Sequence, residues 1–324
     1  MTLQPASPRP VTGLQVLVTG GSGFIGRHVV TQLTGAGHTV TVADRQAFPD
    51  RSVPTVVGDL CEPSVREEAV ATGTEAIVHL AAATSVLGSI ERPGQVYRIN
   101  VEATADLLEL ARRRGVPTVV LASTNAVVGD VGHRIISEDL PLTPLTPYGA
   151  TKAAAEMMLS GYAGAYGIRA PALRLTNVYG PGMAGKDSFV PRLLRAAAAG
   201  EGVEIYGDGE QRRDLVHVAD VARAFASAVA EWPSGPVIVG GSRSYTVNEI
   251  TQAARAATGL PITATTVPAK PGEMPAVVVD IARARSRGYL PSVSLVEGLR
   301  SAWADFVPVA DAEAGEQGMV DARA

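Results

Sequence analysis

Three glycines follow a short apolar segment near the start of the chain and come directly before a helical pattern. In such a motif the first glycine permits a tight strand-to-helix turn, the second lets a pyrophosphate approach the backbone, and the third lets the helix pack against the strand. The N-terminus of the helix then offers unpaired N–H groups and a positive dipole end to phosphate. The spacing after Val16–Val18 predicts a dinucleotide site that includes Gly20, Gly23, Phe24, Ile25 and Gly26.

A second β-branched segment, Thr39–Ala43, ends on an acidic residue, Asp44. A carboxylate at that strand end can accept both hydroxyls of an adenosine ribose, and it repels the additional phosphate of NADP. Arg45 follows directly and could instead bind that phosphate. The carboxylate favours NAD as the cofactor, and NADP is the alternative.

Composition limits the classes of protein to which the chain can belong. The 324 residues are 46% hydrophobic and 19% charged, which predicts a globular protein with one large or two closely associated domains. A net charge of −4 with no basic stripe argues against a nucleic-acid partner. Cys61 is the single cysteine, so neither a disulfide framework nor a metal site is predicted, and a reducing compartment fits. Because no apolar run reaches the length of a membrane span and Met1–Pro10 is no signal peptide, we expect a cytoplasmic protein without a membrane partner.

Strand-like and helical patterns alternate through the first half of the chain. This alternation predicts an α/β fold, namely a Rossmann-type doubly wound parallel sheet with a smaller, interleaved C-terminal α/β substrate domain. We expect strands near 55–57, 76–80, 118–121, 172–175, 203–206 and 237–239, and helices near 63–72, 97–114, 148–166 and 189–199. The predicted units are an NAD-binding domain at 12–175 with a return segment near 215–242, a substrate-binding domain at 176–307, and a disordered tail at 308–324.

Tyr148 and Lys152 stand four residues apart at the start of one predicted helix, so their side chains share a face. An ammonium one turn away favours the phenolate, which predicts a lowered pKa for Tyr148 and a role as general acid or base. Thr124 follows the predicted strand 118–121, and ligands of open α/β sheets bind where strands end. The predicted catalytic residues are therefore Thr124, Tyr148 and Lys152.

The glycine motif is followed in order by Asp59–Leu60, Leu80–Ala82, Ser123–Thr124, the Tyr148/Lys152 pair, and the segments 177–181, 205–209 and 213–218. Over roughly residues 14–305 the chain resembles the extended short-chain dehydrogenases/reductases of the nucleotide-sugar epimerase/dehydratase family. The resemblance implies NAD as cofactor, a nucleotide sugar as substrate, and a homodimer formed through the helices near 97–114 and 148–166.

The resemblance also implies roles for individual residues. The cofactor is implied to contact the glycine loop, Asp44, Arg45, Tyr148 and Lys152. Further implied cofactor contacts are Asp59 and Leu60 at the adenine, Leu80, Ala81 and Ala82 at the nicotinamide, and Asn100 as a support. The residues implied to bind the nucleotide sugar are Thr124 and Tyr148 at the sugar, Asn177 and Arg213 at the diphosphate, Phe189 and Tyr206 at the base, and Lys270 and Glu273 near the nucleotide.

The chain departs from the family pattern at two places that bear on the reaction. Val128 stands where family members usually have a tyrosine. Family 4,6-dehydratases follow the active-site threonine with an Asp-Glu pair that eliminates water, whereas this chain has Asn125–Ala126. We therefore expect a nucleotide-sugar 4-epimerase of the UDP-hexose or UDP-hexuronate class rather than a dehydratase. The alternatives are a 4-ketoreductase, which would use the same three residues and release its cofactor, and a non-catalytic NAD-binding sensor.

Overall fold

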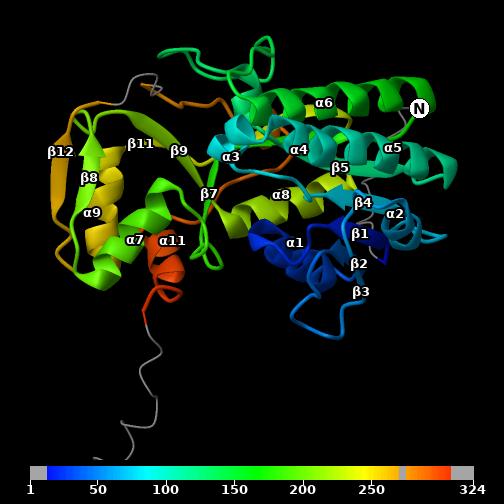
Figure 1. Ribbon diagram of the computed structural model, residues 1–324, viewed down its shortest axis with the longest axis horizontal. Helices are drawn as coiled ribbons and strands as arrows, with labels where there is room; N and C mark the ends of the chain where they lie inside the picture. The colour runs from blue at the N-terminus through cyan, green and yellow to red at the C-terminus, as the bar shows by residue number, and fades with distance from the viewer. Residues whose placement is uncertain (1–12, 270–274, 308–324) are drawn as a thin grey trace, which may run out of the picture.

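A seven-stranded parallel sheet forms the centre of the molecule, and a smaller lobe extends from the edge where the strands end (Figure 1). The computed structural model describes residues 13–269 and 275–307. The order of the strands across the large sheet is β10 (Gly235–Val239), β6 (Pro171–Leu175), β5 (Thr118–Thr124), β4 (Ala76–His79), β1 (Gln15–Thr19), β2 (Thr39–Asp44) and β3 (Thr55–Val57). This arrangement confirms the predicted doubly wound α/β fold.

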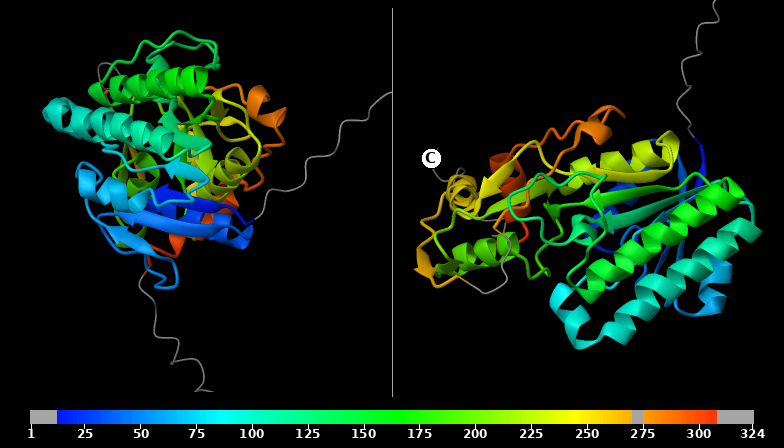
Figure 2. Two further views of the ribbon diagram at one scale, coloured as in Figure 1. Left: turned by 90° about the vertical axis from the view of Figure 1, so that its right-hand side faces the viewer. Right: turned by 90° about the horizontal axis from the view of Figure 1, so that it is seen from above.

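Helices cover both faces of the large sheet, because its buried strands carry apolar side chains on both sides. One layer consists of α1 (Phe24–Gly35) and α8 (Val218–Ala230), and the opposite layer of α2 (Pro63–Ala69), α5 (Ala103–Arg113) and α6 (Pro147–Tyr166) (Figures 1 and 2). Within β1, Val16 and Val18 pack in the first layer and Leu17 packs in the second, as the two-residue period of a strand requires. The apolar segment of β1 therefore contributes side chains to the hydrophobic cores on both faces of the sheet.

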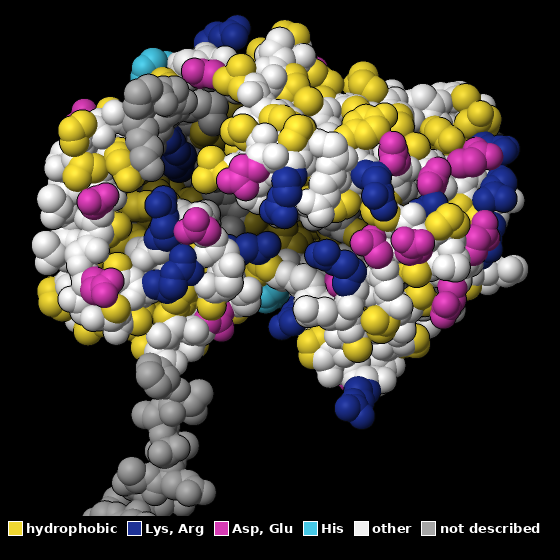
Figure 3. Space-filling view, viewed as in Figure 1, with side chains coloured by type: hydrophobic (Ala, Val, Ile, Leu, Met, Phe, Trp, Pro, Cys, Tyr) yellow, Lys and Arg dark blue, Asp and Glu magenta, His cyan; other side chains and the backbone are white. Residues whose placement is uncertain are grey.

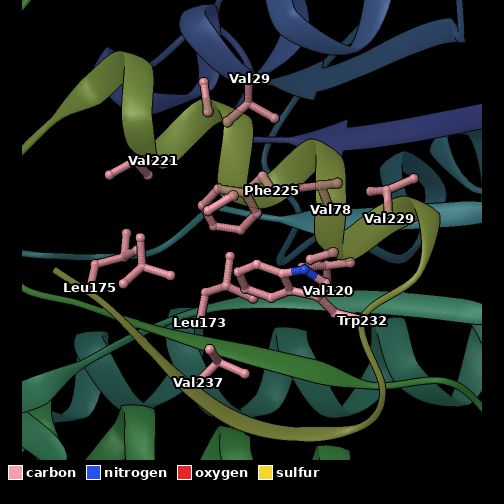
Figure 4. Close-up of a cluster of buried hydrophobic side chains, with 14 of the residues drawn as sticks. Val29, Val78, Val120, Leu173, Leu175, Val221, Phe225, Val229, Trp232 and Val237 are labelled. Carbon is pink, nitrogen blue, oxygen red and sulfur yellow. The ribbon is translucent and has the colours of Figure 1, made fainter. Parts of the chain in front are cut away.

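The largest buried side chains of the first layer come from α8 and the residues that follow it. Phe225 and Trp232 lie over the strand residues Val120 and Leu173, and none of the four is more than 1% exposed (Figure 4). Burying a side chain of this size stabilises the fold by about 1.5–3 kcal/mol relative to leaving it exposed. This packing joins the helix after β9 to the strands of the first half of the chain.

The described residues of the smaller lobe form two short sheets and three helices. One sheet has the order β11 (Ser244–Thr246), β9 (Arg212–His217) and β7 (Asn177–Tyr179), and the other pairs β12 (Ala264–Val267) with β8 (Val203–Tyr206). Its helices are α7 (Phe189–Ala199), α9 (Val247–Thr258) and α11 (Leu295–Trp303), which enclose a third apolar core. The short helix α10 (Ala282–Arg285) lies against β10 of the large sheet.

The chain returns from the smaller lobe to the large sheet. Strand β10 pairs in parallel with β6, and Val237 lies opposite Leu173. The predicted strand at 237–239 therefore lies in the large sheet, beyond the first strands of the smaller lobe in sequence. Within the described residues, no helix is long and apolar enough to cross a membrane.

Three predicted element boundaries were wrong. The helix expected at 97–114 consists of α4 (Pro93–Tyr97), a π-helical turn η1 (Arg98–Glu102) and α5, and the turn carries a buried asparagine that bonds to a neighbouring loop. Strand β5 continues to Thr124 because its last residues pair with β6. Helix α2 ends at Ala69 rather than near 72. The Arg114 guanidinium donates hydrogen bonds to the carbonyl oxygens of Glu67 and Val70 at this end of the helix.

Candidate active site

The glycine turn lies where the strand order of the large sheet changes direction, between β1 and β4. Connections from β1 lead towards β2 and those from β4 lead towards β5, which leaves a crevice at their carboxyl ends. Gly20 has a positive φ of 73°, and a Cβ there would lie 2.7 Å from the backbone nitrogen of Ala81. A Cβ on Gly26 would overlap the carbonyl oxygen of Gly20. Any side chain at either position would force these backbone segments apart.

The start of α1 has the properties of a pyrophosphate site. Gly23 occupies the N-cap position and has no side chain to cover the first N–H groups, and the first turn, which begins at Phe24 and Ile25, carries no acidic residue. The twelve-residue helix directs its positive dipole end towards this turn. The backbone around Gly20 and Gly23 therefore fits the pyrophosphate of a dinucleotide.

Asp44 lies beside the glycine turn and is held there by backbone groups. Its carboxylate accepts hydrogen bonds from the backbone N–H groups of Ser22, at 3.0 Å, and Gln46, at 3.3 Å. The Ser22 hydroxyl also donates to the Gln46 carbonyl at 2.8 Å, so the turns after β1 and β2 are joined. The predicted ribose acceptor is thus oriented before any ligand binds.

Asp59 and Leu60 follow β3 at the same edge of the sheet. The backbone N–H of Cys61 is the main cause that holds the pKa of Asp59 below its usual range, and the positive charges of Arg45 and Arg98 add to the effect. Arg45 is exposed, so its guanidinium lies near Asp59 while remaining open to solvent. Leu60 is buried beneath this edge.

Helix α6 brings the catalytic candidates together at its first turns. Thr146 caps the helix by accepting from the backbone N–H of Gly149 at 3.2 Å, and Pro147 occupies its first position. The buried hydroxyl of Ser89 accepts from the backbone N–H of Tyr148 at 3.2 Å. The Thr124 hydroxyl, at the end of β5, lies near enough to the Tyr148 phenol to act on its pKa, which it lowers. Thr124 and Tyr148 therefore meet at one point at the carboxyl edge of the sheet.

The expected lowering of the Tyr148 pKa by Lys152 was wrong. Burial raises the pKa of Tyr148, and only the hydrogen bond from Thr124 opposes this. The Lys152 ammonium instead donates to the carbonyl oxygen of Ala122 on β5 at 2.9 Å. Burial lowers the pKa of Lys152 to about 8, against the opposing charge of Glu156. The loss of hydration on burial therefore affects the pKa values of Tyr148 and Lys152 more than their spacing along the helix does.

Asn100 supports the site from behind through its side-chain amide. The amide oxygen accepts from the backbone N–H of Ala83 at 2.8 Å, and the amide nitrogen donates to the Ala83 carbonyl at 3.0 Å and to the Thr151 hydroxyl at 3.1 Å. The residue is 2% exposed. Asn100 therefore joins the loop after β4, which contains Leu80, Ala81 and Ala82, to helix α6.

The residues predicted to bind the nucleotide lie on the smaller lobe. Asn177 begins β7, and its amide donates to the carbonyl oxygen of Asp214 on the adjacent strand β9 at 2.9 Å, one residue from Arg213. Phe189 begins α7 and Tyr206 ends β8, and these two elements pack together. Lys270 and Glu273 lie outside the described residues.

A hollow separates the smaller lobe from the large sheet, and several Lys and Arg side chains surround it (Figure 3). The glycine turn and Tyr148 belong to the large-sheet side, and Arg213 belongs to the other. A ligand with a negatively charged centre and two different ends fits between lobes of this kind.

Sequence reasoning missed three polar residues that organise the site, namely Ser22, Ser89 and His79. Ser22 lies within the glycine motif, and Ser89 is buried beneath the start of α6. His79 is buried at the end of β4 between two threonine hydroxyls. A histidine at the end of an otherwise apolar strand was the one signal in the sequence that could have identified such a site.

We predict that Gly26→Ala abolishes retention of the dinucleotide, because the added methyl group overlaps backbone atoms of the glycine turn. Gly35→Ala is the matched control in the same helix, since a Cβ there meets no atom within 4 Å. The control should bind the dinucleotide normally and keep its free energy of unfolding within about 1 kcal/mol of the original value, because Gly35 is the last residue of the helix. Isothermal titration with NAD measures the first effect and urea unfolding the second. Equal NAD affinity for both variants would contradict the assigned turn.

Comparisons with known proteins agree with this arrangement. Residues 16–240 match the model of the NAD dependent epimerase/dehydratase family. The putative UDP-glucose 4-epimerase of Methanocaldococcus jannaschii is 32% identical over 297 residues, which are 88% of this chain and 96% of that protein. The UDP-glucose 4-epimerase of Thermotoga maritima, solved with UDP-glucose, has a TM-score of 0.85 and 31% identity, covering 90% of this chain and 98% of that one.

A second similar structure is that of MoeE5 in complex with UDP-glucuronic acid and NAD, with a TM-score of 0.82 and 37% identity, covering 90% of this chain and 99% of that one. The family description and this complex confirm the expected cofactor, NAD. The matched segment includes the glycine turn, Asp44 and all three catalytic candidates. The chain therefore belongs to the NAD-dependent epimerase/dehydratase family and is an NAD-dependent enzyme of that family.

Proposed function

We propose that the protein is a nucleotide-sugar 4-epimerase that acts on UDP-hexoses or UDP-hexuronates. The contact between the Thr124 hydroxyl and the Tyr148 phenol, at the carboxyl edge of the sheet, is the observation that carries this proposal. The contact provides an acid/base pair for a sugar hydroxyl at the place where an α/β sheet binds its cofactor. The relatives from Methanocaldococcus jannaschii and Thermotoga maritima support the reaction type.

Asn125 and Ala126 favour epimerisation over dehydration. They form the first half of the short 3₁₀ helix η2 (Asn125–Val128), directly after Thr124. Neither side chain can donate or accept a proton as a carboxyl group can, so no acid/base pair stands next to the threonine to remove water from the sugar. The remaining chemistry is removal and return of hydrogen at a single carbon.

The dinucleotide would bind across the switch point of the large sheet. The glycine turn would hold its pyrophosphate and Asp44 its adenosine ribose, with Asp59 and Leu60 beside the adenine. Leu80, Ala81 and Ala82 would line the nicotinamide. The Lys152 ammonium lies 2.9 Å from the Ala122 carbonyl oxygen, and from this position it would donate to the ribose that carries the nicotinamide.

Tyr148 would carry the proton of the reacting hydroxyl. When bound, NAD would supply a reversible acceptor for the hydride of C4 and the positive charge of its oxidised ring. That charge would favour the phenolate, which burial disfavours. The phenolate then takes the proton from O4 as the C4–H bond breaks, and Thr124 donates to the same oxygen. Once the sugar has turned over in the hollow, Tyr148 would return the proton to O4, so that one residue serves as base and then as acid.

The nucleotide end of the substrate would occupy the smaller lobe. Arg213 and Asn177 would bind the diphosphate, since a guanidinium and an amide both donate hydrogen bonds to phosphate oxygens. Phe189 and Tyr206 would border the base, and Lys270 and Glu273 remain predicted contacts near the nucleotide. The choice of UDP follows the ligands named for the relatives, UDP-glucose and UDP-glucuronic acid.

Purified protein should interconvert C4-epimeric UDP-sugars without added cofactor. The variant Tyr148→Phe should lower turnover by about 10²–10⁴-fold, because it removes the acid/base group. Tyr166→Phe is the matched control, since it removes a phenolic oxygen from an exposed position on the same helix. Anion-exchange chromatography of the sugars measures both rates. If reaction requires one added NADH or NADPH per sugar, the ketoreductase is the correct function. NAD binding without turnover of any UDP-sugar would support the sensor.

The protein would form a homodimer through the helices around α5 and α6. Met157 and Tyr166 on α6 are 57% and 54% exposed, and Tyr97, the last residue of α4, is 51% exposed, so large side chains are available for such a contact. Gly161 and Gly164 are exposed on α6 and would permit a second helix to approach closely.

We predict a dimer by sedimentation velocity and a monomer for Met157→Asp, because a carboxylate in the centre of an apolar helix contact would lose its hydration. Leu290→Asp is the control, because Leu290 is 68% exposed outside these helices. The dimer is wrong if the unchanged protein sediments as a monomer at micromolar concentration, or if both substitutions have the same effect.

A further inference from the structure

His79 is a buried histidine between the two turns that form the dinucleotide crevice. It is the last residue of β4, is 2% exposed, and directly precedes the turn at Leu80–Ala82. In the register of the sheet it lies beside Thr19, the last residue of β1, which directly precedes the glycine turn. The mechanism proposed above assigns no role to its imidazole.

The imidazole takes part in two hydrogen bonds whose directions are determined by their partners. The Thr104 hydroxyl lies 3.0 Å from Nε2 and donates its single proton to the Asn100 carbonyl oxygen at 2.7 Å, so it accepts from Nε2–H. Because burial keeps the ring neutral, Nδ1 carries no proton and accepts from the Thr19 hydroxyl at 2.7 Å. His79 is thus neutral and present as a single tautomer.

Thr19 extends this chain of hydrogen bonds to both turns of the crevice. Its hydroxyl oxygen accepts from the backbone N–H of Ala81 at 3.3 Å, and its carbonyl oxygen accepts from the backbone N–H of Leu80 at 3.0 Å. The backbone of Ala81 is also the group that a Cβ on Gly20 would overlap. The orientation of the Thr19 hydroxyl therefore affects the turn after β4 at its contact with the glycine turn.

The other end of the chain reaches the catalytic helix. The backbone carbonyl oxygen of Asn100 accepts from Thr104, and the side-chain amide of the same residue bonds to Ala83 and to Thr151. The Thr151 hydroxyl donates to the carbonyl oxygen of Tyr148 at 2.8 Å. An uninterrupted set of hydrogen bonds thus runs from the glycine turn to the first turn of α6.

We propose that His79 is a positioning residue that holds the glycine turn and the turn at Leu80–Ala82 at the spacing required for a bound dinucleotide. The proposal rests on the dinucleotide site described above and not on the sugar reaction. A crevice that is already ordered binds its ligand more tightly, because less conformational freedom is lost on binding. Replacement of the imidazole should therefore weaken NAD binding more than it weakens nucleotide-sugar binding on the other lobe.

The electrostatic environment keeps the ring in the form that this role requires. Burial, together with the smaller effect of the positive charge of Lys152, lowers the pKa of His79 to about 3. A protonated ring would carry a proton on Nδ1 and could no longer accept from Thr19. At neutral pH the set of hydrogen bonds remains intact.

The test compares His79→Leu with Ile77→Ala. Ile77 is a fully buried residue two positions earlier on the same strand and face, and its truncation destabilises the fold without removing a hydrogen bond. We expect His79→Leu to raise the Kd for NAD at least tenfold, about 1.4 kcal/mol, and to change the Kd for UDP less than twofold. Ile77→Ala should lower the melting temperature but leave both dissociation constants within twofold.

A second pair of variants tests the direction of the bonds and avoids any loss of folding caused by the large change at His79. Thr19→Val removes the hydroxyl with little change of shape, and Thr19→Ser retains it. We expect the Kd for NAD to rise about tenfold in Thr19→Val and to stay near the original value in Thr19→Ser. In His79→Leu the further substitution Thr19→Val should have little effect on NAD binding, because the same interaction is already lost.

The possible outcomes separate this proposal from the proposed function. Two results would show that His79 only fills the core and that the proposal is wrong, provided that the unchanged protein binds NAD. In the first, His79→Leu and Ile77→Ala weaken NAD binding equally at an equal loss of stability. In the second, Thr19→Val binds NAD as tightly as Thr19→Ser does. If the unchanged protein does not bind NAD, the dinucleotide site itself is wrong. Normal NAD binding without turnover of UDP-sugars would contradict the proposed reaction and leave the role of His79 supported.

Discussion

The direct backbone contact between the turns after β1 and β4 is the constraint on which the rest of the site depends. Only a hydrogen atom fits between Gly20 and the backbone of Ala81. This contact brings the start of α1, Asp44 and the loop before Asn100 to one edge of the sheet, where parallel strands of an open α/β fold bind their ligands. The two apolar layers on either side of β1 and β4 keep the contact in place.

Polar groups buried around this edge then determine where the chemistry can occur. Glu156, four residues after Lys152, forms an ion pair with Arg174 at 2.8 Å and accepts from the Ser123 hydroxyl at 2.5 Å, which joins α6, β6 and the end of β5. Removing one partner of such a buried pair typically costs 3–5 kcal/mol, so these elements keep a fixed relation. Thr124 and Tyr148 meet because the residues beside them are held in this way.

The parts of the structure that depend on short local patterns could be predicted from the sequence. The glycine spacing, the β-branched segment before Asp44 and the Tyr148/Lys152 spacing identified the fold and the elements that carry the site. The pKa of Tyr148 could not be predicted, because it depends on burial and on the direction of the Lys152 ammonium rather than on helical spacing. The π-helical turn at Asn100 and the bonds of His79 were also missed, since each partner lies on a different element.

In the proposed reaction, hydrogen leaves one carbon of a nucleotide sugar and returns to the same carbon. The most direct measurement uses a UDP-hexose or UDP-hexuronate deuterated at C4, incubated with purified protein in ordinary water and analysed by NMR and mass spectrometry. The C4-epimeric product should keep its deuterium at C4. Loss of the label to solvent, or a product that has lost water, would rule out the proposed reaction.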